Sequence, residues 1–221
     1  ISLMDHTPGQ RQWQDVEQAR VYYCGKKGWS RAQFDAQVAL EHEMQALHAA
    51  SNRRAVVSHA RTRGIVLASH DDTLPEHVHE AHAEGVSISE FPTQAEAARA
   101  ARSTGMAIVM GAPNVVRGGS HSGNVAAIEL ARCGLLDALS SDYVPASLLL
   151  AAFRLVDEGG FSLPRAIATV TAGPARAARL GDRGEICVGK RADLVQVRLV
   201  ESAGRSQPIV RSVWREGRRV V

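Results

Sequence analysis

The chain has 221 residues, 45% of them hydrophobic and 22% charged, a balance typical of globular proteins that excludes disorder over most of its length. Its 26 basic and 23 acidic residues leave a net charge of +3, and the basic residues are spread without aromatic interleaving, which argues against nucleic acid as a partner. No apolar run approaches the roughly 20 residues that cross a bilayer, the start lacks a signal-peptide pattern, and three distant cysteines cannot build a disulfide framework, so we expect a cytoplasmic protein with no membrane partner.

Residues 1–6 predict a strand that runs straight into a polar turn, with no initiator Met before it. We therefore expect the chain to begin within a domain. Two helices should follow, one at about 14–24 and a longer one that opens at the capping box Ser30-Arg31-Ala32-Gln33.

From residue 65 onward, apolar runs alternate with helical patterns. Capping boxes are expected at Thr73-Leu74-Pro75-Glu76 and Thr93-Gln94-Ala95-Glu96. Strands that alternate with helices through short loops pair in parallel by right-handed crossovers, so an α/β fold is predicted, although the pattern alone does not decide between a barrel and an open sheet. The expected strands are 65–69, 86–90, 107–111 and 138–141, and the helices after them lie within 73–84, 93–104, 123–133 and 145–158.

The pattern changes after the helices around residues 165–180. Short strands without intervening helices are expected at 183–186, 192–197, 209–214 and 218–221. We predict one domain over 1–180 and a small all-β domain over 181–221.

Side chains that can bind a metal or take part in acid–base chemistry follow the expected strands. In parallel α/β folds the reacting groups sit at the carboxyl ends of strands. Two imidazoles and a carboxylate in such positions can bind a divalent ion with open coordination positions, which favours hydrolysis. Alternatively, each of these residues caps a helix or bonds to a loop. They are His6, His70, Glu90, Asn114, Arg117 and Asp142.

The remaining histidines gain no such role. His77 and His79 are two apart on an expected helix, point to different faces and are interpreted as surface residues. His42, His48 and His59 on the long helix are interpreted as surface or packing residues.

The segment 111–124 is rich in glycine and also holds a cation, an imidazole and hydroxyls before a helix N-terminus. Backbone N–H groups and an Arg there suit a phosphate or phosphonate group. An ordinary glycine-rich surface loop is the alternative, since the segment lacks both the phosphate-loop and the Rossmann fingerprints.

Taken together, these residues resemble the amidohydrolase superfamily of metal-dependent hydrolases. The segment Arg183-Gly184-Glu185-Ile186-Cys187-Val188-Gly189-Lys190-Arg191-Ala192-Asp193-Leu194-Val195 is similar to the return of that family's chain to its β-sandwich. The resemblance implies the C-terminal part of a distorted (β/α)8 barrel plus part of a small β-sandwich. In the family, histidines end strands 5 and 6 and an Asp ends strand 8. This order implies His6, His70 and Asp142 as ligands of zinc, one or two ions, and Asp142 as the group that takes the water proton.

Within the superfamily, four motifs resemble the diphosphatases that cleave α-D-ribose 1-methylphosphonate 5-triphosphate in the carbon–phosphorus lyase pathway. The motifs are 2–12, 68–72, 110–114 with 117–124, and 140–145. The resemblance implies hydrolysis of an acid anhydride that yields the 5-phosphate and pyrophosphate, with a small phosphorylated ribose phosphonate as partner, and it allows a homo-oligomer. The implied substrate-binding residues are Asn114, Arg117, Ser120 and His121.

The sequence departs from the family in one respect, because the H-x-H pair after strand 1 and the bridging carboxylate or modified Lys after strand 4 have no counterpart. We expect a fragment that is inactive alone and that aggregates, pairs with another chain or stays partly disordered.

Two other functions remain open. One is cleavage of a C–N bond by a cyclic amidase, deacetylase or deaminase, and the other is a non-catalytic scaffold in a phosphonate-degrading assembly.

Overall fold

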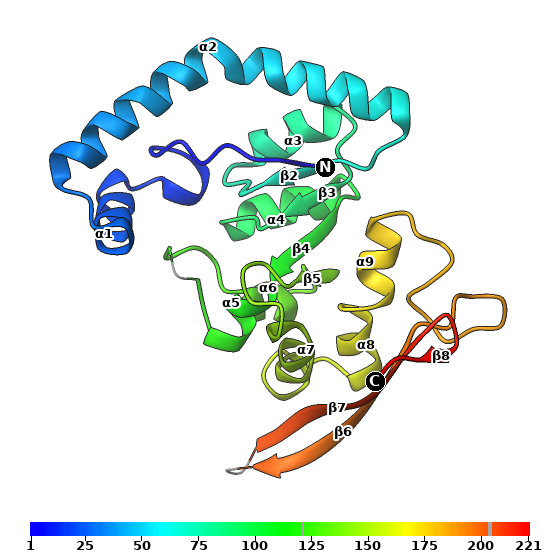
Figure 1. Ribbon diagram of the computed structural model, residues 1–221. Helices are drawn as coiled ribbons and strands as arrows, with labels where there is room; N and C mark the ends of the chain where they lie inside the picture. The colour runs from blue at the N-terminus through cyan, green and yellow to red at the C-terminus, as the bar shows by residue number, and fades with distance from the viewer. Residues whose placement is uncertain (121, 203–204) are drawn as a thin grey trace. The chain divides into compact units, whose positions relative to one another are not determined.

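The structure is a computed structural model that describes residues 1–120, 122–202 and 205–221 (Figure 1). Two compact units make up the chain. The first unit comprises Ile1–Ile108 and Ser120–Val125, and the second comprises Val109–Gly119 and Ala126–Val221.

Three short parallel strands lie at the centre of the first unit. β1 (Ser2–Leu3) pairs with β2 (Ala68–His70), and β2 pairs with β3 (Ile88–Glu90). In this register His70 lies opposite Glu90. The strands are parallel because a helical connection returns the chain to the same edge each time, as the alternation in the sequence predicted.

A long helical connection separates β1 from β2. A 3-10 turn, η1 (Arg11–Trp13), leads into α1 (Val16–Lys27) and then into α2 (Arg31–Arg63), which arches over the first unit in Figure 1. The predicted capping box of Ser30 and Gln33 is confirmed. Around the start of α2, Trp13, Ala19 and Phe34 form a small apolar core.

The structure corrects both predicted capping boxes of the next two helices, α3 (Pro75–Ala83) and α4 (Ala95–Ser103). The hydroxyls of Thr73 and Thr93 bond to each other at 2.8 Å. At the start of α3 the ring Nδ1 of His77 accepts the N–H of Thr73 at 3.2 Å, in the role that Glu76 was expected to fill. His77 is therefore a half-buried capping residue, not the surface residue that its spacing predicted.

The second unit is built on two parallel strands with helices after each. β4 (Ala107–Gly111) begins in the first unit, where the N–H of Ala107 donates to Ser87, and its later residues pair with β5 (Ala138–Ser140). The predicted positions of both strands are confirmed, and the helix predicted at 123–133 begins only at Ala127. The helices are α5 (Ala112–Arg117), α6 (Ala127–Arg132), α7 (Ser147–Asp157), α8 (Leu163–Ala168) and α9 (Ala172–Ala177).

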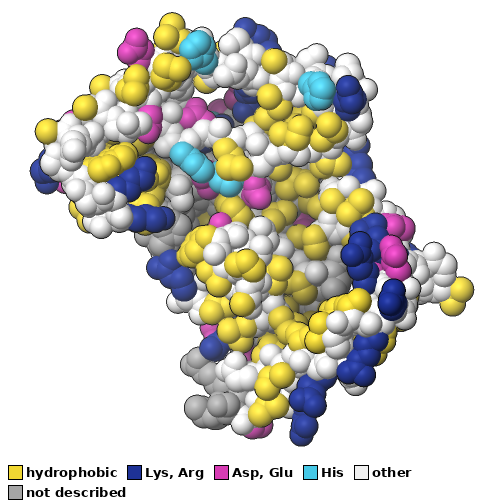
Figure 2. Space-filling view, in the orientation of Figure 1, with side chains coloured by type: hydrophobic (Ala, Val, Ile, Leu, Met, Phe, Trp, Pro, Cys, Tyr) yellow, Lys and Arg dark blue, Asp and Glu magenta, His cyan; other side chains and the backbone are white. Residues whose placement is uncertain are grey.

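The chain ends in an antiparallel sheet of β6 (Leu194–Ser202), β7 (Arg205–Arg215) and β8 (Arg218–Arg219), in that order. Residues 183–185 form bends and residue 186 has no regular structure, in place of the predicted strand. Lys and Arg side chains lie beside apolar ones over this sheet in Figure 2. The all-β character of the end of the chain is confirmed, whereas the domain boundary at 180/181 stays a prediction.

The α/β fold class is thus confirmed. Among the described residues, no helix is both long and apolar enough to cross a membrane.

Candidate metal centre

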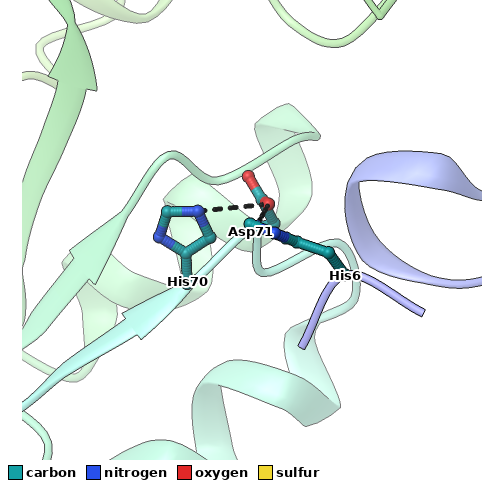
Figure 3. Close-up of side chains that lie close together, drawn as sticks. All are labelled: His6, His70 and Asp71. Carbon is teal, nitrogen blue, oxygen red and sulfur yellow. Dashed lines mark ion pairs between the residues drawn. The ribbon is translucent and has the colours of Figure 1, made fainter. Parts of the chain in front are cut away.

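Two of the predicted ligands, His6 and His70, lie together at the carboxyl ends of β1 and β2. Their ring centroids are 5.1 Å apart. The carboxylate of Asp71 completes the group, with its Oδ2 3.5 Å from His6 Nε2 and 3.4 Å from His70 Nε2 (Figure 3). One ligand atom from each residue lies within 4.8 Å of the other two, so the three side chains can share one ion.

Asp71 Oδ2 is a buried acceptor that no hydrogen bond from the described residues reaches. The Asp71 side chain is only 6% exposed. A buried carboxylate oxygen without a donor costs free energy unless a cation or a further donor meets it. Its environment of two imidazole nitrogens therefore fits a divalent metal ion, whose preferred ligands are nitrogen and carboxylate oxygen.

The backbone aims Asp71 into this group. Its φ is +53°, in the left-handed region that non-glycine residues rarely adopt, and its N–H donates to the carbonyl of Glu90 at 2.9 Å. Strained φ values of this kind gather at functional sites. The turn after β2 thus directs His70 and the next residue toward one point.

The other ring nitrogen of His70 contacts Glu90. The distance from His70 Nδ1 to Glu90 Oε2 is 2.8 Å, and Ser2 Oγ donates to the same oxygen at 2.6 Å. Burial raises the pKa of Glu90, but the hydrogen bonds from His70 and Ser2 outweigh it and hold the pKa below its ordinary value. Glu90 is therefore a carboxylate, and His70 donates its Nδ1–H to it.

A buried ion pair supports the backbone of His70. Arg11 Nη1 donates to the His70 carbonyl at 2.9 Å and to Asp72 Oδ1 at 3.2 Å. Asp72 is fully buried, and its other oxygen accepts hydrogen bonds from Ser69 and Ser89. Because both oxygens of Asp72 accept hydrogen bonds, the buried carboxylate needs no water, and the pair can fix the end of β2.

Asp5 fixes the loop that carries His6. Its Oδ1 accepts the N–H and the hydroxyl of Thr7, and its Oδ2 accepts the amide of Gln45 on α2 at 2.6 Å. Burial raises the pKa of Asp5, but these hydrogen bonds, led by that of Gln45, hold it below its ordinary value.

A groove of about 860 Å³ opens beside His6, beneath α2. Figure 2 shows the surface hollowed there. Its walls have polar groups near His6 and apolar groups on α2. Because the groove is open to solvent, a small molecule could reach the candidate metal centre through it. The lining includes Asp5, His6, Arg11, Leu40, Met44 and Gln45.

Asp142, the third predicted ligand, belongs to the second unit, where it follows β5 with a φ of +48°. Its side chain is exposed and packs over Gly111, since a Cβ built on that glycine would lie 3.3 Å from Asp142 Oδ2. The family's strand numbers leave room for one strand between His70 and Asp142, whereas the described residues of that interval form two, β3 and β4. The ligand and proton-transfer roles of Asp142 stay predictions.

The predicted substrate-binding residues are divided between the units. In the second unit, Arg117 Nη1 donates to the hydroxyl of Tyr143 at 3.3 Å, and Asn114 Oδ1 accepts the N–H of Ala127, which caps α6. In the first unit, Ser120 Oγ accepts the N–H of Ser122 at 3.1 Å. His121 lies outside the described residues.

Sequence reasoning missed Asp71, although it stands next to a predicted ligand. The signal in the sequence was the run Ser69-His70-Asp71-Asp72, in which two carboxylates follow a strand end. Asp72 is fully buried, so the two carboxylates cannot have the same role. Only the left-handed turn at Asp71 reveals which carboxylate faces the histidines.

The chain is similar to known proteins in sequence and in fold. The model of the amidohydrolase family matches residues 66–221. The chain is 51% identical over its whole length to the alpha-D-ribose 1-methylphosphonate 5-triphosphate diphosphatase of Escherichia coli strain K12, and it spans 58% of that protein's length.

Two solved structures resemble the chain at low identity. The 5-methylcytosine deaminase of Klebsiella pneumoniae matches with a TM-score of 0.53 and 17% identity over 78% of this chain and 52% of the deaminase. The ochratoxinase of A. niger also matches with a TM-score of 0.53, at 18% identity over 74% of this chain and 43% of that enzyme. These similarities show a shared fold.

Proposed function

The chain belongs to the amidohydrolase family, and on that premise we propose that it is part of a metal-dependent hydrolase that cleaves α-D-ribose 1-methylphosphonate 5-triphosphate to the 5-phosphate and pyrophosphate. The 51% identity over the whole chain to a diphosphatase of that substrate carries this proposal. The site supports it, because His6, His70 and Asp71 offer one metal-ligating atom each.

His6, His70 and Asp71 would hold the ion in the first unit. When bound, a divalent ion supplies Lewis-acid activation of water and of a phosphoryl oxygen near neutral pH. Two nitrogens and one carboxylate oxygen make a suitable set for zinc. We propose zinc, as one or two ions, in agreement with the ligand types present.

Side chains of the protein itself would transfer the proton and bind the substrate. We assign to Asp142 the proton of the attacking water, whose oxygen bonds to the α-phosphorus while the bond from that phosphorus to the bridging oxygen breaks. Pyrophosphate leaves with the bridging oxygen, and the ribose keeps one phosphate. The exposed carboxylate at the end of β5 supports this role.

Donors for the anionic ends of the substrate are proposed from the segment after β4. Arg117 offers a guanidinium, and Asn114, Ser120 and His121 offer amide, hydroxyl and ring donors. Cations and N–H or O–H donors bind phosphate oxygens by charge-assisted hydrogen bonds. We further propose a cytoplasmic enzyme that can form homo-oligomers, with the C-terminal part of a hydrolase barrel over 1–180 and a partial β-sandwich domain over 181–221.

Phosphorus NMR tests the proposal directly. The full-length protein loaded with Zn²⁺ is incubated with α-D-ribose 1-methylphosphonate 5-triphosphate and, in separate samples, with dihydroorotate and an N-acetyl amino sugar. Pyrophosphate from the triphosphate alone is expected. Turnover of an amide without a phosphorus product would instead assign the site to C–N bond cleavage, and a protein that binds no divalent ion would contradict both activities.

A further inference from the structure

The carboxylate of Glu90 lies between a hydroxyl and an imidazole. Ser2 Oγ and His70 Nδ1 both contact its Oε2, at 2.6 and 2.8 Å. The Glu90 side chain is 22% exposed and that of His70 is 10% exposed, so little water competes for these hydrogen bonds. The three residues come from three adjacent strands, β1, β2 and β3.

The strand register builds this contact. His70 and Glu90 are paired residues at the ends of β2 and β3, and Ser2 pairs with Ala68 on the other side of β2. The N–H of Asp71 donates to the Glu90 carbonyl at 2.9 Å, which holds the two strand ends together beyond the last pair. The position of Glu90 against His70 is therefore fixed by the backbone.

This contact decides which ring nitrogen of His70 carries the proton. A carboxylate only accepts hydrogen bonds, so the hydrogen between the two groups belongs to Nδ1. In neutral imidazole the opposite nitrogen, Nε2, then has a lone pair, and Nε2 is the atom that lies 3.4 Å from Asp71 Oδ2. A carboxylate behind a histidine both selects its tautomer and makes the ring a stronger ligand.

We propose that Glu90 is a positioning residue, which fixes the Nδ1–H tautomer of His70 so that Nε2 faces His6 and Asp71 as a metal ligand. Ser2 holds the carboxylate in place from the other side. The inference rests on the metal centre of the proposed function. It assigns Glu90 no contact with the substrate.

The tautomer can be measured without metal or substrate. Nitrogen-15 NMR of the histidine rings is recorded for the full-length, metal-free protein at a pH where the rings are neutral, with His70 assigned by comparison with His70→Gln. We expect Nδ1–H in the wild type, a shift to Nε2–H in Glu90→Leu, and retention of Nδ1–H in Glu90→Gln, whose amide oxygen still accepts. Glu96→Leu and Glu96→Gln are the matched controls, because Glu96 is an exposed carboxylate at the start of α4.

Competition with a chromophoric chelator then gives the Zn²⁺ affinity of the same proteins. Loss of the carboxylate behind a metal-ligating histidine should lower the affinity about 10–100-fold in Glu90→Leu, with a smaller loss in Glu90→Gln and none in the Glu96 variants. Circular dichroism checks that each variant folds.

Three results would overturn the inference. His70 could keep its Nδ1–H in Glu90→Leu, the Zn²⁺ affinity of that folded variant could equal that of the wild type, or Glu90→Gln could lose the ion as completely as His70→Gln does, which would make Glu90 a ligand. A wild-type protein that binds no divalent ion would contradict the proposed function, and the NMR result alone would then decide the tautomer.

Discussion

Gln45, in the middle of α2, donates a hydrogen bond from its side-chain amide to Oδ2 of Asp5 at 2.6 Å. Asp5 directly precedes His6 in the sequence. The other oxygen of Asp5 is occupied by Thr7. Asp5 therefore ties the loop of the candidate metal centre to a helix that supplies no ligand itself.

Replacement of Gln45 by Ala should weaken metal binding by His6. The loop loses a hydrogen bond to a charged acceptor, which we place at about 1 kcal/mol because the contact is only partly buried. This corresponds to roughly a fivefold weaker Zn²⁺ affinity by chelator competition. Gln37→Ala, which removes a bond to Glu41 within α2, is the control, and equal affinities in the two variants would refute the link.

Gly111→Ala should disturb Asp142. A Cβ there would stand 3.3 Å from Asp142 Oδ2, closer than most Cβ contacts, so the carboxylate must move. A displacement of about 1 Å can cost a catalytic group about 100-fold in rate, and for the smaller shift needed here a fall in kcat of roughly threefold to tenfold is expected in the full-length enzyme. Gly119→Ala is the control, since a Cβ there meets no described atom within 4 Å.

Asp142→Asn separates proton transfer from metal binding. If Asp142 accepts the water proton, the amide should lower kcat by about 100-fold or more while the Zn²⁺ content, measured by atomic absorption, stays near that of the wild type. Unchanged turnover would remove Asp142 from the mechanism, and loss of zinc would show that it is a ligand.

Gly173→Ala should destabilise the second unit. The carbonyl oxygens of Asp137 and Ala168 would lie 2.2 and 2.9 Å from the new Cβ, and backbone atoms cannot swing aside as a side chain can. We expect a loss of more than about 3 kcal/mol in the free energy of unfolding, measured with urea. Gly181→Ala, where a Cβ meets no described atom within 4 Å, should change it little.

His77 should make stability depend on pH. Burial lowers its pKa, and the charge of Arg11 lowers it further, against Asp72, Glu80 and Glu76, which raise it. A histidine with a lowered pKa in the fold binds its proton more readily when unfolded, so its effect is absent well above about pH 6.5 and stability falls as the pH drops through that value.

The variant His77→Glu tests this dependence. Its carboxylate can accept the same N–H groups at every pH in the range, as the third residue of a capping box does. The fall in Tm from about pH 7.5 to about pH 5.5 should therefore be smaller than in the wild type. His79→Glu adds the same charge to the exposed side of α3, and an equal change in that variant would contradict the role of His77.

Much of the fold followed from the sequence because glycines and apolar runs mark where strands and helices change over. The strand 107–111 was placed to the residue, since its apolar run follows the turn at Gly105 and ends at Gly111. The strand expected at 183–186 was wrong: its apolar residue Ile186 is 91% exposed, so the pattern had no partner to pack against.

The site was predictable only in part. His6 and His70 were found because each stands at the end of an expected strand, and parallel strands bring their carboxyl ends together. Asp71 was not, because its part in the site depends on a left-handed φ that a sequence does not reveal in a non-glycine residue. The predicted caps of α3 and α4 were wrong for a related reason. The hydroxyls of Thr73 and Thr93, which are distant in the sequence, form a hydrogen bond with each other.

The contacts that α2 makes through Gln45 and Arg53 fix the number of residues between these two positions of the helix. Gln45 holds Asp5, and Arg53 binds the carboxylate of Glu84 through two nitrogens. One residue inserted between these two positions would rotate one contact by about 100° and shift it by about 1.5 Å, so both could not form at once. Relatives that keep this site should therefore change the length of α2 near its ends, and leave the spacing between its two attachment points constant.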